Sequence, residues 1–182
     1  MEVATLRIGH RLVRDDRVTT HSALVARAFG CSKIYMSDVD ESIIKTVEKV
    51  ATNWGRSDFL IEICDDWKEI VRMWKKDGAK IIHLTMYGMN VDNMIEPIRS
   101  EDKILVVIGA KKVPRELFEI ADMNIAIGNQ PHSEIAALAV FLDRIFSGNE
   151  LKKGFGIANY KIIPDLKGKS VEYKSVRNRS NI

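Results

Sequence analysis

One short segment of the chain concentrates polar side chains of several chemical types. The run Gly128 to Glu134 brings amide, imidazole, hydroxyl and carboxylate groups together directly before an almost wholly apolar stretch at residues 135–142. Ser133 alone would be enough to cap a helix that begins there. The surplus polar groups therefore favour recognition of a ligand, although a polar cap on a buried helix is the simpler alternative.

A second segment, near the N-terminus, concentrates basic side chains. Within eleven residues it holds four arginines and one histidine: Arg7, His10, Arg11, Arg14 and Arg17. A guanidinium group matches the geometry of phosphate oxygens, so this spacing predicts a surface that contacts RNA phosphates. The alternative is that Asp15 and Asp16 neutralise two of these arginines in surface ion pairs.

Three short apolar runs each meet a glycine. Residues 80–84 lead to Gly88, residues 104–108 to Gly109, and residues 124–127 to Gly128. Ligands of open parallel sheets bind outside the carboxyl ends of the strands, and glycine lets a backbone approach a ligand closely. The three loops therefore predict a nucleotide-like ligand, unless the glycines merely end strands. The G-x-G-x-x-G and G-x-x-x-x-G-K-[ST] motifs are missing, which disfavours a Rossmann site or a P-loop.

Apolar strands alternate with amphipathic helices along most of the chain. Strands are expected at residues 5–8, 33–36, 59–63, 80–84, 104–108 and 124–127. Helix caps are expected at Thr20, Asp40, Asp65-Asp66 and Ser133. This alternation indicates an α/β fold with a mostly parallel sheet and helices on both faces. Residues 1–150 are expected to form that domain, and residues 151–182 a C-terminal extension packed on it, with short strands at 160–163 and 171–173.

Charge is divided unevenly along the 182 residues, whose net charge is +3. Residues 151–182 hold eight basic and two acidic side chains, a charge of +6; residues 1–150 hold 20 basic and 23 acidic ones, a charge of −3. A basic extension on an acidic body predicts a polyanionic partner, unless the extension is only a frayed, solvated end.

Other features limit the class of protein. No apolar run approaches about 18 residues and the N-terminus has no secretory pattern, so neither a membrane helix nor secretion is expected. Cys31 and Cys64 flank apolar segments, which predicts reduced, buried thiols in a cytoplasmic protein. The four histidines show no metal-ligand spacing, so no metal site is expected.

Several motifs together resemble one family. Residues 20–31, THSALVARAFGC, are similar to the first motif of SPOUT-class methyltransferases, in which an arginine shortly precedes Ala-Phe-Gly. With residues 6–11 (LRIGHR), 83–88 (HLTMYG) and 128–134 (GNQPHSE), the chain resembles the archaeal tRNA cytidine-56 2′-O-methyltransferases over about residues 5–165. Two positions depart from the expected pattern. His21 stands where the class often has Asn, which leaves its role open, and Lys111 stands where an acidic residue is expected.

The resemblance implies a homodimer, a deep trefoil knot in the C-terminal half of the domain, and S-adenosylmethionine as cofactor. It places that cofactor on Leu84, on Gly109, Ala110, Lys111, Lys112 and Val113, and on Ile127, Gly128, Asn129, Gln130, Pro131, His132, Ser133 and Glu134. These are the three loops that the strand-end glycines mark.

The implied reaction is methyl transfer to the ribose 2′-hydroxyl of a T-loop cytidine in tRNA. Arg27 matches the family's arginine, and we expect it to orient the ribose and stabilise developing alkoxide charge. In a dimer it could face cofactor held by the other subunit. His21 is a candidate proton acceptor because imidazole titrates near neutral pH, or it simply packs at a helix N-terminus.

Two rival functions remain open at this point. One is a non-catalytic RNA-binding α/β protein, which would bind RNA but not S-adenosylmethionine. The other is a phosphate-transferring or hydrolytic enzyme, suggested by the Arg, Gly and His near the first strand, although the order of residues in histidine phosphatases is missing.

Overall fold

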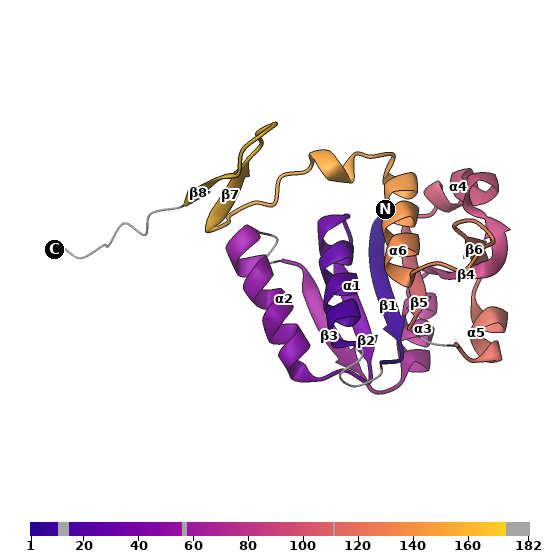
Figure 1. The fold of residues 1–182 in the computed structure, drawn as a ribbon. Coiled ribbons are helices and arrows are strands. Elements are labelled where there is room, and N and C mark those ends of the chain that lie inside the picture. The colour runs from indigo at the N-terminus through magenta and orange to yellow at the C-terminus, as the bar shows by residue number, and fades with distance from the viewer. Residues whose placement is uncertain (11–14, 56–57, 111, 174–182) are drawn as a thin grey trace.

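The alternation of strands and helices builds one six-stranded parallel sheet in a computed structural model, which describes residues 1–10, 15–55, 58–110 and 112–173. The strands lie in the order β3-β2-β1-β5-β4-β6 (Figure 1). Their bounds are β1 Glu2–Ile8, β2 Lys33–Ser37, β3 Leu60–Cys64, β4 Lys80–Asn90, β5 Lys103–Gly109 and β6 Met123–Ala126. All five pairings are parallel, which confirms the predicted fold class.

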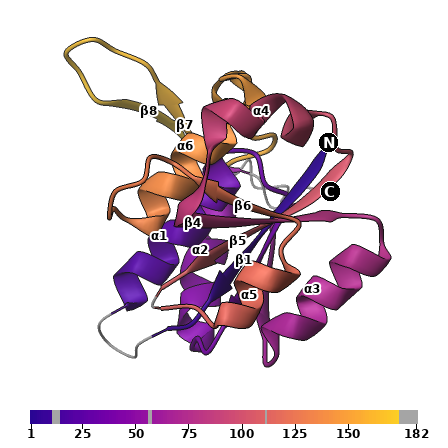
Figure 2. The same ribbon diagram turned by 90° about the vertical axis from the view of Figure 1, so that its right-hand side faces the viewer.

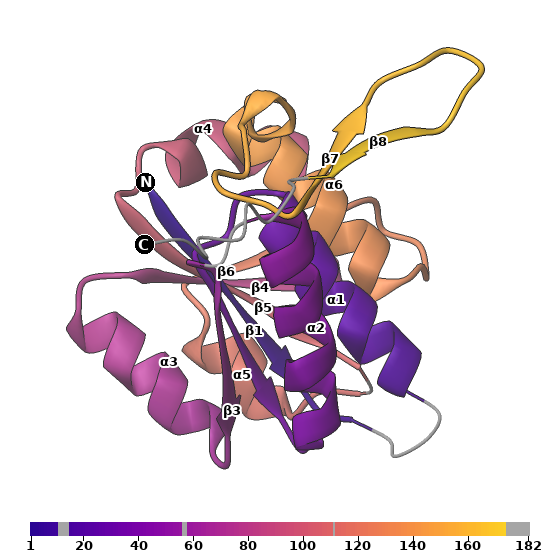
Figure 3. The same cartoon turned by 90° about the vertical axis from the view of Figure 1, so that its left-hand side faces the viewer.

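Helices cover both faces of this sheet. They are α1 Asp16–Ala28, α2 Glu41–Trp54, α3 Trp67–Lys76, α4 Val91–Arg99, α5 Arg115–Ile120 and α6 Glu134–Phe146. One apolar cluster joins the sheet to α1, α2, α4 and α6, and a second cluster joins it to α3 and α5. Figures 2 and 3 show α3 and α5 on the face opposite to α1 and α2. The strands are therefore buried from both sides, as their continuous apolar runs predict.

The capping residues show where local sequence chemistry decides a helix end. The side chains of Asp40, Asp66 and Ser133 each accept a hydrogen bond from a backbone N–H of the first turn, as predicted. The prediction for Thr20 was wrong. Helix α1 begins four residues earlier, at Asp16, and the Thr20 hydroxyl donates to the Asp16 carbonyl from inside the helix.

The order of β4, β5 and β6 in the sheet determines where the candidate site lies. Strand β5 lies between β1 and β4, and the chain then crosses to the far side of β4 to form β6. Strand β4 continues six residues beyond its predicted end at Leu84, with an irregularity at which both Leu84 and Met89 pair with Ile125 of β6. The trefoil knot implied by the resemblance stays a prediction, since strand order alone does not define it.

The segment after α6 crosses the amino edge of the sheet. It contains the 3₁₀ turn η1 Glu150–Lys152 and an antiparallel hairpin, β7 Tyr160–Ile163 and β8 Ser170–Tyr173 (Figure 1). The Tyr160 ring meets the Trp54 ring of α2 edge-on, 5.3 Å between centroids. A Cβ atom at Gly55 would overlap the backbone of Phe155, so these two segments lie in close contact. The domain boundary at residue 150 stays a prediction.

Two further expectations concern buried thiols and membranes. Cys31 and Cys64 are both buried, as predicted, and burial raises the pKa of the Cys64 thiol to about 11. In the described part of the chain, no helix has the length and apolarity needed to cross a lipid bilayer.

Candidate active site

A cleft of about 660 Å³ opens at the carboxyl ends of β4 and β5. This volume is within the range of small-molecule sites in proteins. Four of its lining residues are predicted cofactor residues: Leu84, Gly109, Lys112 and Val113. The lining is completed by His83, Thr85, Met86, Tyr87, Arg115 and Phe118. The cleft is thus mainly apolar and aromatic, with two cationic side chains and one buried imidazole.

The wall formed by residues 85–88 depends on a close approach between two backbones. A Cβ atom at Gly88 would overlap the carbonyl group of Asn124 and the amide nitrogen of Ile125 in β6. Only glycine fits there without displacing one of the strands. Gly88 therefore lets the end of β4 curl tightly against β6, and this curl forms one side of the cleft.

The loop between β6 and α6 is fastened onto that curl. The Asn129 side-chain amide donates to the Met86 carbonyl oxygen at 2.8 Å and to the Gly88 carbonyl oxygen at 3.1 Å. Gly128 has a φ of +73°, a left-handed conformation that suits glycine at this turn. The structure thus brings the first and third predicted loops together, with Asn129 as the bridge.

The other predicted cofactor residues that the structure describes do not line the cleft. Gln130, Pro131, His132 and Ser133 are exposed, and none of the residues 127–134 lines the cleft. Ala110 is held by a hydrogen bond from its amide nitrogen to the Ile8 carbonyl oxygen. Lys111 lies outside the described residues.

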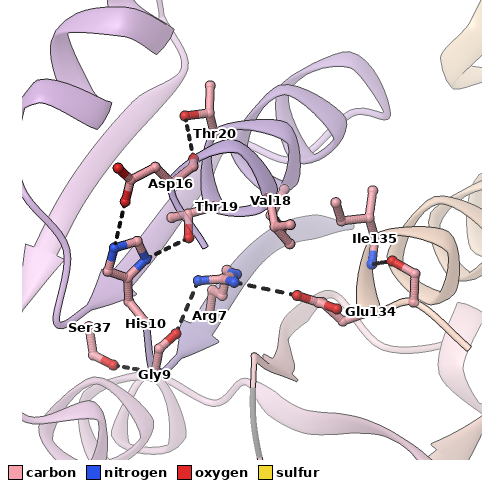
Figure 4. A network of polar contacts seen from close by, with 12 residues as sticks. Arg7, Gly9, His10, Asp16, Val18, Thr19, Thr20, Ser37, Glu134 and Ile135 are labelled. Carbon is pink, nitrogen blue, oxygen red and sulfur yellow. Dashed lines mark hydrogen bonds and ion pairs between the residues drawn. The ribbon is translucent and has the colours of Figure 1, made fainter. Parts of the chain in front are cut away.

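The N-terminal basic segment is organised around two buried side chains (Figure 4). Arg7 is 1% exposed and donates to the Gly9 carbonyl oxygen at 3.0 Å and to Glu134 Oε1 at 3.4 Å. Its burial corrects the prediction that Arg7 contacts RNA: β1 is a central strand covered on both faces, so the guanidinium is used inside the protein. It ties the end of β1 to the first residue of α6.

His10 is also an internal residue. Its Nδ1 lies 2.9 Å from Thr19 Oγ1 and its Nε2 lies 3.0 Å from Asp16 Oδ1 (Figure 4). The imidazole therefore fastens the first turn of α1 to the end of β1, and its burial also corrects the prediction of an RNA contact. Arg17 is exposed on α1. Arg11 and Arg14 lie outside the described residues.

The two predicted catalytic residues are not brought together. His21 is exposed, whereas Arg27 is 6% exposed and lies six residues further along α1, about 9 Å along the axis. Arg27 Nε donates to the Gly55 carbonyl oxygen at 3.1 Å, and its guanidinium lies over the Phe155 ring, 5.2 Å from the centroid. It lines a groove of about 1150 Å³ between the ends of α1 and α2 and the C-terminal segment.

Arg27 and the cleft lie at opposite edges of the sheet within one chain. Helix α1 starts at the carboxyl edge, after β1, and returns to the amino edge, where β2 begins (Figure 1). The cleft lies at the carboxyl edge, at the ends of β4 and β5. The two parts therefore do not meet within one chain.

Sequence reasoning missed several cleft residues. His83, Arg115 and Phe118 were not predicted as site residues, although each lines the cleft. His83 directly precedes Leu84 in a buried strand, and a polar residue in such a strand is a usable signal. Phe118 lies on a helix whose position over β4 depends on the non-local order of the strands.

Comparison with known proteins identifies the family. The family model described as "tRNA ribose 2'-O-methyltransferase, aTrm56" matches residues 54–172. A tRNA (cytidine(56)-2'-O)-methyltransferase of Nitrosopumilus maritimus is 51% identical over 97% of this chain and 99% of that protein. The chain belongs to the aTrm56 family. A relative from Thermofilum pendens with the same description is 56% identical over 93% of this chain and 94% of that protein.

Solved structures of SpoU and TrmH proteins confirm the fold of this chain. A TrmH/SpoU tRNA modifying enzyme of A. aeolicus gives a TM-score of 0.61 at 15% identity, covering 86% of this chain and 81% of that one. The SpoU methyltransferase AviRb of Streptomyces viridochromogenes, solved in complex with AdoMet, gives 0.60 at 11% identity, covering 81% and 58%. At these identities the likeness shows the fold alone, and that fold is the SPOUT type predicted from the motifs.

Proposed function

We propose that this chain transfers a methyl group from S-adenosylmethionine to the ribose 2′-hydroxyl of cytidine 56 in tRNA. The observation that carries the proposal is identity of about 50% to enzymes of that description over nearly the whole chain. The rival hydrolytic function and the non-catalytic RNA-binding function have no comparable support.

The cleft fits the cofactor by the chemistry of its lining. Leu84, Val113 and Phe118 offer apolar contact to a planar base, while Lys112 and Arg115 offer cations to a carboxylate. When bound there, S-adenosylmethionine supplies a methyl group on a sulfonium, an electrophile that becomes a neutral thioether as the methyl leaves. The protein needs only to hold and orient the reactants and to assist loss of the hydroxyl proton.

Arg27 has the chemistry to orient the nucleophile. Its guanidinium stays protonated, so it acts as a hydrogen-bond donor that positions the ribose and the adjacent phosphate and stabilises negative charge on the 2′-oxygen. The Gly55 carbonyl and the Phe155 ring hold it in place. His21, exposed on the same helix, remains a candidate acceptor of the hydroxyl proton.

We propose a homodimer, which the separation of Arg27 and the cleft within one chain supports. Because each chain carries both parts at opposite edges, two copies could form two sites, each with the cleft of one subunit and Arg27 of the other. We propose tRNA as the polyanionic partner, with the exposed Arg17 and the basic C-terminal extension as phosphate contacts. The cytoplasmic location stays a prediction.

The proposed function is tested by measuring methyl transfer to tRNA. The protein is incubated with labelled S-adenosylmethionine and an unmodified tRNA transcript, and the methylated nucleotide is mapped. Label on the 2′-oxygen of cytidine 56 is the expected result, and Arg27→Ala should abolish it while leaving cofactor affinity largely intact. Cofactor binding without transfer to that ribose would contradict the assignment of substrate, and binding of tRNA alone would favour the non-catalytic alternative.

A further inference from the structure

His83 is a buried polar residue of the cleft that the proposed mechanism does not use. It lies on β4 with 1% of its surface exposed, and it lines the cleft beside Leu84 and Phe118. The Phe118 ring meets the imidazole edge-on, with 4.7 Å between the centroids and 88° between the planes. These contacts fix the plane of the imidazole.

The neighbouring amide fixes where the imidazole carries its proton. Asn124 Nδ2 donates to the Phe118 carbonyl oxygen at 2.9 Å, and a carbonyl can only accept. Asn124 Oδ1 must therefore face His83, where it lies 2.8 Å from Nδ1. An amide oxygen also only accepts, so Nδ1 of His83 carries the hydrogen. The chain from Phe118 through Asn124 thus selects one tautomer.

Burial favours the neutral form of this imidazole. Removal from water lowers the pKa of His83, and the hydrogen bond to Asn124 offsets only part of that effect. The charged groups that line the same cleft, Lys112 and Arg115, are both cations and offer no counter-charge for an imidazolium. Nε2 consequently presents a lone pair, and among the described residues it has no hydrogen-bond donor.

We propose that Nε2 of His83 accepts a hydrogen bond from the exocyclic amine of the cofactor's adenine. This inference deepens the proposed function and rests on it. A neutral acceptor in a cleft also lined by Leu84 and Phe118 suits the amine-bearing edge of a flat base whose two faces make apolar contacts. The other nitrogen donor of the cofactor is its ammonium group, which the two cations of the cleft disfavour. His83 is therefore a residue that selects an aminopurine over an oxopurine.

The test compares two ligands that differ at that amine. Calorimetry measures the dissociation constants of S-adenosylhomocysteine and of its deaminated analogue, S-inosylhomocysteine, with the full-length protein. The wild type should prefer the adenosyl ligand by about tenfold, the value of one well-placed hydrogen bond in a buried site. His83→Phe keeps a ring but removes the acceptor, so the preference should fall to about one- to twofold. His83→Gln, which restores an acceptor, should recover part of it.

Nitrogen NMR of the wild type supplies a readout independent of affinity. In the free protein, Nδ1 should show the shift of a protonated nitrogen and Nε2 that of an unprotonated one, and Nε2 alone should move when S-adenosylhomocysteine binds. As a matched control, Lys45→Ala, an exposed change on α2, should leave both ligand affinities unchanged.

The outcomes separate this inference from the proposed function. If the wild type binds neither ligand, the cofactor assignment fails. If it binds S-adenosylhomocysteine and His83→Phe, shown to be folded by its unfolding curve, keeps the full preference, the inference about His83 alone is overturned. A protonated Nε2 in the free protein would overturn it as well.

Discussion

Mixed dimers test whether the site is shared between two chains. Arg27 lies in the last turn of α1, a helix of 13 residues and therefore about 20 Å long. The cleft lies at the edge of the sheet where that helix starts. An arginine side chain cannot span this distance, so Arg27 cannot serve the cleft of its own chain.

The perturbation combines two variants that damage different halves of the site. Arg27→Ala removes the guanidinium, and Val113→Trp fills the cleft with a large ring. Each variant alone should be inactive. When equal amounts are co-expressed with two affinity tags, half of the dimers should be mixed, and each mixed dimer should have one intact site of two. The unfractionated mixture should therefore show about a quarter of wild-type activity, and purified mixed dimers about half.

The assay is transfer of labelled methyl to a tRNA transcript, with unfolding curves recorded for each variant. If one chain supplied both parts of a site, every chain in the mixture would carry a defect and no activity would return. Folded but inactive mixed dimers would therefore refute the reasoning. Arg27→Lys, which keeps a cation beside the Phe155 ring, guards against a result caused by misfolding alone.

Three further predictions concern stability. Gly88→Ala should lower the free energy of unfolding by about 3 kcal/mol because the new methyl group overlaps the backbone of β6. Gly154→Ala, with open space around it, should change that free energy little. Equal denaturant midpoints for the two variants would contradict this prediction. Burial raises the pKa of Glu150, so its ionisation costs stability as pH rises above the carboxyl's ordinary value. Glu150→Gln should therefore raise the melting temperature at pH 7 but not at pH 4, and a gain that is the same at both pH values would refute it. Glu134→Ala should cost about 1 to 3 kcal/mol in denaturant unfolding because it removes a partner of the buried arginine of β1, whereas the exposed pair broken by Glu119→Ala should cost less than about 0.5 kcal/mol.

The parts of the fold that follow from local chemistry were predictable. Asp40 and Ser133 cap helices because their side chains satisfy backbone N–H groups two residues away, a relation written into adjacent positions. Thr20 has the same chemistry, yet it lies inside α1. The first turn there is held by His10, which reaches Asp16 and Thr19 from the end of β1. That contact depends on the fold, and composition around Thr20 gives no sign of it.

The parts of the site that depend on strand order were not predictable from composition or spacing. Arg7 looks like a surface arginine next to His10 and Arg11, but β1 lies between β2 and β5, and both of its faces are covered. A residue of a central parallel strand is buried whatever its type, so its polar atoms must find partners inside the protein. Glu134, 127 residues away, supplies one of them. The same strand order places β4 between β5 and β6, and thereby puts His83 between a helix and a cleft whose ligand its free nitrogen can help to select. Sequence motifs identified the loops, while the buried polar residues that connect them required the three-dimensional arrangement.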